Sequence, residues 1–306
     1  MTAVSEELFA EVSTGSTGGE RVTLCYQTFG SPDGEPLLLV MGLGGPMTWW
    51  DIRLCTLLAE SGFYVIRYDN RDIGRSSRLS GRVSRVQLAK AFLGLRVTPP
   101  YTIGDMAADA VGLLDALGVE QAHVCGMSMG GMIVQTLAVE HPDRVRSVVS
   151  VMSTTGKRSV GWQHPSILPV LLKPARGRAE YVKGGIAIER LIGSPGFPAD
   201  EEATRQRLEE TWDRGIWSSG VARQMLAVLT QPDRTAGLRK VGVPFSVVHG
   251  LADKMVHVSG GRATSMAVPG AELLLIQGMG HDLPEPLWPT FLRIIKETAA
   301  RAQRPD

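Results

Sequence analysis

One serine in this sequence stands in a pattern that can make it a nucleophile. Gly126-Met127-Ser128-Met129-Gly130 is the only G-x-S-x-G run in the chain, and it lies between an apolar run and a helical pattern. A serine on such a sharp strand–turn–helix bend has a strained backbone that costs about 1–3 kcal/mol, and glycines two residues away prevent a side-chain clash. The bend exposes the hydroxyl and directs free helical N–H groups at a reacting carbonyl. We therefore predict Ser128 as a nucleophile.

A serine hydroxyl is a weak nucleophile until a base removes its proton, and six histidines could supply that base. His281 closes the run Gly278-Met279-Gly280-His281, directly after the last predicted strand. A loop at that edge of the sheet can hold an imidazole over the bend that carries Ser128. We predict His281 as the general base.

A carboxylate must hold the imidazole, and in sites built on such a bend it lies between the serine and the histidine in the chain. Asp253 meets this condition in a short loop after the predicted strand Phe245–His249. The other usual position, after Val145–Met152, reads Ser-Thr-Thr-Gly-Lys and has no carboxylate. Asp282 ranks below Asp253, because an immediate neighbour of His281 points elsewhere. We predict that Asp253 orients His281 and stabilises its imidazolium form.

A glycine-rich turn after the predicted strand can bind the oxyanion that forms when the serine attacks. It reads Met-Gly-Leu-Gly-Gly-Pro over residues 41–46. We predict the N–H groups of Leu43 and Met129 as the two donors, and the loss of one such donor typically costs about 2.7–4 kcal/mol of transition-state stabilisation. A dinucleotide-binding loop would need a third glycine where Met47 stands. The sequence also lacks a phosphate-binding lysine motif and a spaced set of metal ligands, so we expect neither a cofactor nor a metal.

Residues close to this turn and to the serine are candidates for a substrate pocket. Trp49 and Trp50 follow the turn, and together with Gly44 and Met127 they form the predicted pocket. The tryptophans further along the chain could equally pack a helical region.

Short apolar runs alternate with helical patterns along most of the chain. The predicted strands are rich in Val, Ile and Leu, as expected of strands covered on both faces, and span Val22–Gln27, Leu37–Met41, Phe63–Arg67, His123–Cys125, Val145–Met152, Phe245–His249 and Leu273–Ile276. The predicted helices span Met47–Glu60, Ile103–Leu117, Met129–Glu140 and Pro286–Arg301. Strands that alternate with helices pair in parallel through right-handed crossovers. The sequence therefore predicts a doubly wound, mostly parallel α/β sheet with an antiparallel first strand.

The alternation stops between about Thr154 and Leu238, where the chain is rich in Pro, Gly, Arg and Trp. About 80 residues is too long for a simple loop in a compact domain. Helical patterns over Asp200–Arg214 and Val221–Leu229 indicate an inserted helical cap. We expect a core made of residues 1–153 and 239–306, with the cap formed by residues 154–238.

The composition is that of an ordinary globular protein: 306 residues, 43% hydrophobic and 21% charged, with a formal net charge of +1. This balance provides no general reason to bind nucleic acid or a membrane, and we expect neither partner. Eight basic residues between Arg67 and Arg96 suggest an anion site, but a solvated connection is the favoured interpretation. Three widely spaced cysteines favour a reducing compartment, the cytoplasm.

These residues together resemble the α/β-hydrolase superfamily. The similarity lies in the Met-Gly-Leu-Gly-Gly turn, the run Tyr68-Asp69-Asn70-Arg71-Asp72-Ile73-Gly74-Arg75-Ser76, the serine bend and the Gly-Met-Gly-His loop. More narrowly, the sequence is similar to the carboxylesterase branch with aclacinomycin methylesterase-like and actinobacterial lipase/esterase-like members. The resemblance covers about Leu24–Gly156 and Val243 to the end of the sequence, and not the cap. It implies the α/β-hydrolase fold and a structural role for the loop over residues 69–76.

The expected activity is hydrolysis of a carboxylic ester of a small or medium apolar molecule through an acyl-enzyme. The partner would be a small-molecule ester. Other activities that use the same three residues remain open: a cofactor-free haloperoxidase or perhydrolase, a thioesterase, or a C–C bond hydrolase. A small-molecule receptor that retains the three residues is the non-enzymatic alternative.

Overall fold

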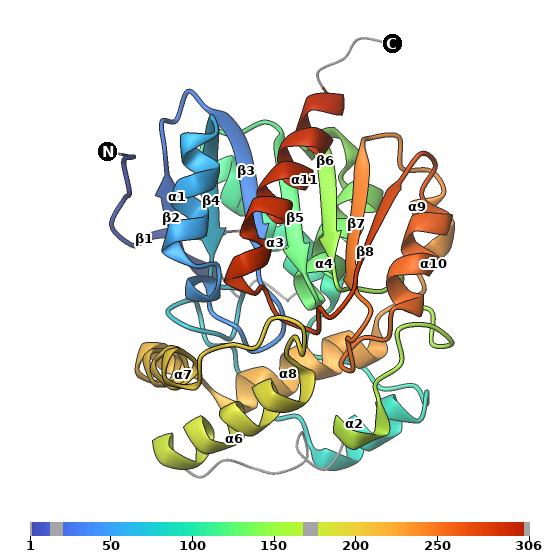
Figure 1. The fold of residues 1–306 in the computed structure, drawn as a ribbon. Coiled ribbons are helices and arrows are strands. Elements are labelled where there is room, and N and C mark those ends of the chain that lie inside the picture. Colours follow the sequence, from blue (N-terminus) through green and yellow to red (C-terminus); the bar gives the residue numbers. More distant parts are fainter. Residues whose placement is uncertain (1, 13–20, 168–176, 303–306) are drawn as a thin grey trace.

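A computed structural model describes residues 2–12, 21–167 and 177–302. Within these residues one sheet of eight strands forms the centre of the molecule, in the order β1-β2-β4-β3-β5-β6-β7-β8 (Figure 1). The strands are β1 (Leu8–Val12), β2 (Val22–Phe29), β3 (Glu35–Val40), β4 (Phe63–Tyr68), β5 (Ala122–Met127), β6 (Val145–Val151), β7 (Phe245–Gly250) and β8 (Glu272–Ile276). β3 and β5, which precede the glycine-rich turn and the serine bend, are neighbours in the middle of the sheet.

Most of the sheet is parallel, and two antiparallel strands lie at one edge. β3 pairs in parallel with β4 and β5, and the parallel pairing continues through β6, β7 and β8. β1 pairs with β2, and β2 with β4, in antiparallel orientation. The predicted doubly wound, mostly parallel sheet is confirmed. Because the carboxyl ends of the parallel strands share one edge, the segments that follow β3, β5, β7 and β8 lie close together.

Helices cover both faces of the sheet. The helices are α1 (Ile52–Glu60), α2 (Arg85–Phe92), α3 (Ile103–Ala116), α4 (Met129–Glu140), α6 (Arg178–Ile192), α7 (Glu201–Gly215), α8 (Ser218–Thr230), α9 (Thr235–Leu238), α10 (Ser259–Ala267) and α11 (Trp288–Arg301). Short 3-10 helices are η1 (Met47–Trp49), η2 (Pro142–Arg144), η3 (Pro165–Ile167) and η4 (Glu285–Leu287). Residues of α3 and α4 pack in one apolar cluster, and residues of α1 and α11 pack in a second one on the opposite face.

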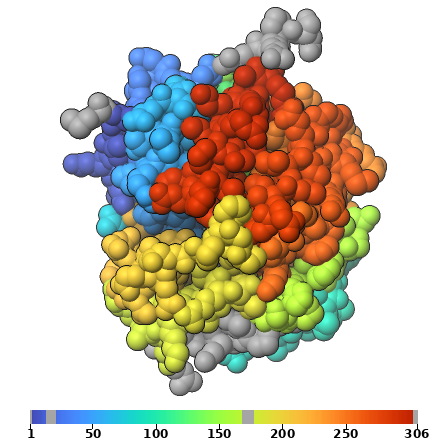
Figure 2. Space-filling view, in the orientation of Figure 1, coloured from blue at the N-terminus to red at the C-terminus, as the bar shows by residue number. Residues whose placement is uncertain are grey.

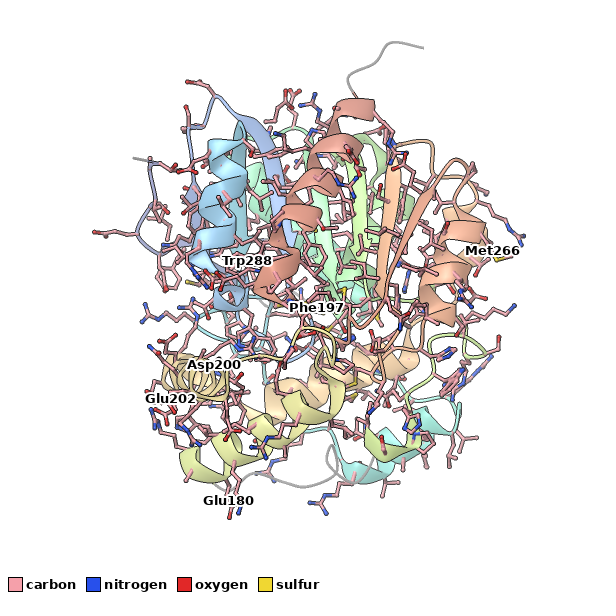
Figure 3. All side chains as sticks on the ribbon, in the orientation of Figure 1. Glu180, Phe197, Asp200, Glu202, Met266 and Trp288 are labelled. Carbon is pink, nitrogen blue, oxygen red and sulfur yellow. The ribbon has the colours of Figure 1, made fainter. Side chains whose placement is uncertain are left out.

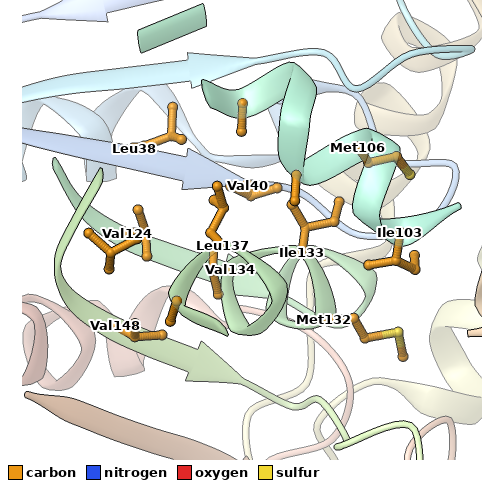
Figure 4. Packing of buried hydrophobic residues seen from close by; sticks show 14 of the residues in the cluster. Leu38, Val40, Ile103, Met106, Val124, Met132, Ile133, Val134, Leu137 and Val148 are labelled. Atoms are coloured by element: carbon orange, nitrogen blue, oxygen red, sulfur yellow. The ribbon is translucent and has the colours of Figure 1, made fainter. Parts of the chain in front are cut away.

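The first apolar cluster fixes α4 against the centre of the sheet (Figure 4). Ile133 and Leu137 of α4 pack with Leu38 of β3 and Val124 of β5, and all four side chains are buried. Burial of a side chain of this size contributes about 1.5–3 kcal/mol. Since β5 and α4 are held by such contacts on both sides of Ser128, the bend between them has little freedom to move.

The segment that the sequence predicts as one helix, Met47–Glu60, is divided in two. After η1, Trp50 has an extended backbone with φ of −76° and ψ of 95°. Asp51 then starts α1, and its side chain accepts a hydrogen bond from the N–H of Arg53. The prediction of a continuous helix was wrong, because the apolar spacing does not show that Asp51 acts as an N-cap.

Helices α6, α7, α8 and α9 follow β6 in the chain and precede β7. α6, α7 and α8 lie beyond the carboxyl ends of the strands, whereas α9 packs against α4 and α10 beside the sheet (Figure 1). In the space-filling view the yellow part of this helical segment lies directly against the blue and red parts of the molecule (Figure 2).

Two buried ion pairs attach the helical segment to the loop after β4. Arg214 of α7 lies 2.7 Å from Asp69, and Arg223 of α8 lies 2.7 Å from Asp72. Both carboxylates are fully buried. Asp72 also accepts a hydrogen bond of 2.8 Å from the Tyr101 hydroxyl. The loop over residues 69–76 therefore has a structural role, as the family resemblance implied.

Arg223→Met should destabilise the protein, because it leaves the buried Asp72 carboxylate without its guanidinium partner. We expect a loss of about 3 kcal/mol in the free energy of unfolding, measured by urea denaturation. Arg293→Met is the matched control, since Arg293 pairs with Glu297 at 2.7 Å on the exposed side of α11, where a pair contributes about 0.3–0.5 kcal/mol. Equal losses in the two variants would contradict this role for the buried pair.

Candidate active site

The bend between β5 and α4 has the backbone geometry that the glycine spacing predicts. Ser128 has φ of 56° and ψ of −117°, in the region that side chains other than glycine rarely adopt. A Cβ atom on Gly130 would lie 2.7 Å from the carbonyl carbon of Val40, and one on Gly126 would overlap the Gly130 carbonyl. Neither backbone could move away without breaking the sheet or the helix. Glycine is therefore required at both positions.

Ser128, His281 and Asp253 form a continuous chain of hydrogen bonds. Nε2 of His281 lies 2.9 Å from Oγ of Ser128, and Nδ1 lies 2.8 Å from Oδ2 of Asp253. The tautomer with its proton on Nδ1 donates to Asp253 and accepts from the Ser128 hydroxyl. Asp253 and His281 are buried, whereas Ser128 is half-buried. This arrangement can move a proton from the serine hydroxyl to the imidazole.

Asp253 is held as an ionised carboxylate by donors to both of its oxygens. Oδ1 accepts from the N–H groups of Met255 and Val256 at 2.8 and 2.9 Å. Burial raises the pKa of Asp253, but the charge of His281 and hydrogen bonds from His249 and His281 outweigh it and hold the pKa well below its usual range. The fully buried His249 lies 3.4 Å from Oδ2. Asp253 is therefore held in its ionised form, which accepts the hydrogen bond from Nδ1 of His281.

The loop that carries His281 rests on the last residue of α6 and on the residues that follow this helix. The N–H of His281 donates to the carbonyl of Ile192 at 2.7 Å, and the N–H of Gly280 donates to Oγ of Ser194 at 2.8 Å. The Ser194 hydroxyl in turn donates to Asp282, which bonds to this serine and not to the imidazole. The helical segment thus supports the imidazole directly, through residues that have no recognisable pattern in the sequence.

The glycine-rich turn after β3 approaches the serine bend closely. A Cβ atom on Gly42 would lie 3.1 Å from Cβ of Ser128, so only glycine lets the two backbones come this near without a shift. The next N–H in the chain belongs to Leu43, and the N–H that follows the serine belongs to Met129. Within the described part of the chain, neither N–H has a hydrogen-bond acceptor. Both are available to a negatively charged oxygen on an atom bonded to Ser128 Oγ.

Gln224 of α8 holds this turn from the opposite side. Its Oε1 accepts from the N–H of Gly44 at 2.9 Å, and its Nε2 donates to the carbonyl of Arg71 at 2.8 Å. Asn70 adds a hydrogen bond of 3.0 Å to the carbonyl of Met41. Gln224 has no exposed surface. It was not predicted, because a glutamine inside a helix carries no sequence signal for a contact with a distant turn.

The structure places the four predicted pocket residues in two different surroundings. Gly44 and Trp49 lie beneath the helical segment, where Nε1 of Trp49 donates to the hydroxyl of Thr211 in α7 at 2.9 Å. Trp50 is only 2% exposed and packs in the apolar cluster with α1 and α11, so its assignment to the pocket is corrected to the core. Its extended backbone turns the ring inward, which adjacency to Trp49 in the sequence does not reveal. Met127 packs in the same cluster beside the bend.

The three cysteines are not competing nucleophiles. Cys25, Cys55 and Cys125 are buried thiols, and none forms a disulfide. Burial raises the pKa of each thiol to about 12. A thiol must lose its proton to react, and these three keep theirs.

No group of three or more His, Cys, Asp or Glu in residues 2–12, 21–167 and 177–302 is arranged to hold a metal ion. No helix in those ranges is long and apolar enough to cross a membrane.

The sheet, the serine bend and the histidine loop after the last strand together define an α/β hydrolase. A family model described as alpha/beta hydrolase fold matches residues 35–285. The chain belongs to this family.

Proteins of similar sequence or structure support the assignment of the chain to the α/β-hydrolase family. The chain is 30% identical to rhodomycin D methylesterase DnrP of Streptomyces peucetius over 286 residues, which cover 87% of this chain and 91% of that protein. It is 28% identical to 3-oxoadipate enol-lactonase 2 of Acinetobacter baylyi over 247 residues, which cover 79% and 80% of the two chains. The solved enol-lactonase from Burkholderia xenovorans LB400 shares the fold, with a TM-score of 0.71 and 20% identity over 95% of this chain and 99% of that one. The resemblance to esterase-like α/β hydrolases is confirmed.

Gly130→Ala should prevent correct formation of the bend, because the added methyl group would overlap the backbone of β3. We expect a loss of more than about 2 kcal/mol in the free energy of unfolding, together with loss of any activity that depends on Ser128. Gly242→Ala is the control, since a Cβ atom there meets nothing within 4 Å. Urea denaturation and circular dichroism measure both effects, and a fully stable Gly130→Ala protein would show that the close approach is not required.

Gln224→Met should impair the site with little effect on the fold, because it keeps the side-chain volume but releases the Gly44 N–H. We expect kcat for an ester substrate to fall by about ten- to a hundredfold, as for small displacements of catalytic groups, with KM nearly unchanged. Gln135→Met removes another fully buried amide, which bonds to Ser150 at 3.0 Å. A similar fall in kcat in both variants would assign the effect to general destabilisation.

Proposed function

We propose that this protein hydrolyses carboxylic esters of small or medium apolar molecules through an acyl-enzyme on Ser128. The observation that carries the proposal is the unbroken chain of hydrogen bonds from Ser128 through His281 to Asp253. Two relatives of the chain are named a methylesterase and an enol-lactonase. Methyl esters and enol-lactones both contain a carboxylic ester bond, which supports the same bond type here.

In the first step the Ser128 hydroxyl attacks the ester carbonyl while Nε2 of His281 takes its proton. The carbonyl oxygen becomes an oxyanion, which the N–H groups of Leu43 and Met129 stabilise. Asp253 stabilises the imidazolium of His281 without taking its proton. The imidazolium then gives the proton to the alkoxide as the C–O bond breaks, and an alcohol leaves.

In the second step a water molecule replaces the alcohol. His281 takes a proton from this water, the resulting hydroxide attacks the acyl carbon, and the same two N–H groups hold the second oxyanion. The bond to Ser128 Oγ breaks, and the serine recovers its proton from the imidazolium. A carboxylic acid leaves, and the three groups return to their initial protonation states.

We propose that residues 154–238, with helices α6, α7 and α8, form a cap over a core made of residues 1–153 and 239–306. The cap would line the space for the acyl or alcohol portion of the substrate. Its contacts with Gly44, through Gln224, and with Trp49, through Thr211, support this role. Val221 of α8 lies 3.6 Å from the position of a Cβ atom on Gly44. Valine and tryptophan at this place favour an apolar substrate group.

Ser128→Ala should abolish ester hydrolysis, because among the described residues Ser128 supplies the hydroxyl that is hydrogen-bonded to Nε2 of His281. We expect turnover of a p-nitrophenyl ester to fall by about 10⁴-fold or more, while circular dichroism shows a folded protein. Ser61→Ala, at the end of α1, is the control and should keep full turnover. An alkyl phosphonate should add its mass to the wild-type protein on the peptide that contains Ser128. Full activity of a folded Ser128→Ala protein would rule the mechanism out.

The same assay with other substrates distinguishes the other activities that this kind of site can have. Oxidation that depends on hydrogen peroxide in acetate would indicate a perhydrolase. A preference for acyl thioesters or for diketones would indicate a thioesterase or a C–C bond hydrolase. Very slow turnover combined with ligand-dependent binding of a partner protein would indicate a receptor.

A further inference from the structure

Half of the basic run between Arg67 and Arg96 contacts other residues of the protein. Four of its arginines each contact a polar, acidic or aromatic partner. The pairs are Arg67 with Gln27, Arg71 with Asp109, Arg75 with Glu7 and Arg78 with Trp217. The fold therefore gives each of these four arginines a partner within the protein.

The other half of the run has no such partners among the described residues. Arg82, Arg85, Lys90 and Arg96 are exposed, and none of them forms an ion pair with a residue in the described ranges. The sequence contains no Asp or Glu from position 73 through position 104. These four cations therefore produce a local positive potential that the net charge of +1 conceals.

Exposed apolar side chains lie between these four cations. Val86, Phe92, Leu93 and Leu95 are 63%, 47%, 72% and 56% exposed. Apolar groups gathered on a surface in this way indicate a binding site more often than isolated ones do. We call the four cations and these four apolar residues the α2 surface.

The geometry of α2 directs this surface away from the molecule. Val86, Lys90 and Leu93 are spaced by four and three residues, so they lie on one stripe of the helix. Ala91, on another side of the helix, is buried. α2 packs against α8 of the helical segment. The α2 surface therefore lies at the end of the molecule where the strands finish.

We propose that the α2 surface docks on an anionic lipid–water interface. The four apolar side chains enter the boundary of the acyl chains, and the four cations contact the negatively charged headgroups. A lipid surface offers both acyl chains and negatively charged headgroups, so it can contact the apolar side chains and the cations at the same time. Apolar residues surrounded by basic ones form the pattern of proteins that lie on a membrane surface without crossing it.

Two other partners fit the α2 surface less well. A symmetric dimer through this surface would place its four cations against the same four cations of a second copy. A nucleic acid would use the cations, but only Phe92 could stack on a base, and three aliphatic side chains would remain in water.

Docking in this way would turn the helical segment toward the lipid, because α8 lies next to α2. An apolar ester dissolved in the interface would then be close to the segment whose Gln224 contacts the turn beside Ser128. This consequence rests on the proposed ester hydrolysis, whereas the docking itself does not.

Co-sedimentation of the full chain with lipid vesicles tests the proposal. Vesicles of phosphatidylcholine mixed with phosphatidylglycerol should bind at least about tenfold more protein than vesicles of phosphatidylcholine alone, and added salt should reduce the difference. Leu93→Glu and Lys90→Glu should each reduce binding to the anionic vesicles at least about fivefold. Met266→Glu is the matched control: Met266 is 87% exposed and projects from α10 outside the α2 surface (Figure 3).

Three results would overturn the proposal: no binding of the wild-type protein to the anionic vesicles, equal binding to both kinds of vesicle, or an equal loss of binding in the Met266→Glu control. A dimer in size-exclusion chromatography that Leu93→Glu dissociates would instead assign the surface to a second copy. The same variants are assayed on a water-soluble p-nitrophenyl ester. Unchanged turnover there separates a failure of docking from a failure of the proposed esterase activity.

Discussion

The site depends on the close approach of three backbone segments around Ser128. The strained bend brings the serine within reach of the turn after β3 only because Gly42, Gly126 and Gly130 have no side chains to separate them. The strain at Ser128 is small compared with the burial of the apolar cluster that holds α4 on the sheet. This constraint places the half-buried Ser128 hydroxyl beside the turn and leaves the N–H groups of Leu43 and Met129 without an acceptor among the described residues.

The helical segment between β6 and β7 completes the site without contributing to the hydrogen-bonded chain of three. It supports the histidine loop through Ile192 and Ser194, and it holds the glycine-rich turn through Gln224. Two buried arginines, Arg214 and Arg223, fix this segment to the core. A buried ion pair stabilises the fold only while both partners stay in contact. We therefore expect the helical segment to keep one fixed position relative to the site.

The mostly parallel α/β architecture and the meeting of Ser128, Asp253 and His281 could be predicted because their signals are local. A glycine spacing or a carboxylate after a strand is visible within a few residues. Gln224 could not be predicted, since its role exists only when α8 meets a turn 180 residues earlier in the chain. α10 could not be predicted either: it begins Ser-Gly-Gly, a poor helix-forming sequence, and its Gly261 is needed because a Cβ atom there would lie 2.5 Å from His249.

The net charge and composition of the whole chain do not describe the charge and polarity of any one part of its surface. The net charge of +1 is correct for the whole chain. In the folded protein, however, some of the cations are buried against carboxylates and others are exposed. Arginines such as Arg71 and Arg223 are buried against carboxylates that come from distant segments, which removes those carboxylates from the surface as well. What remains exposed on α2 is therefore more positive and more apolar than any average over the sequence, and an interaction surface can arise in a protein whose overall composition indicates none.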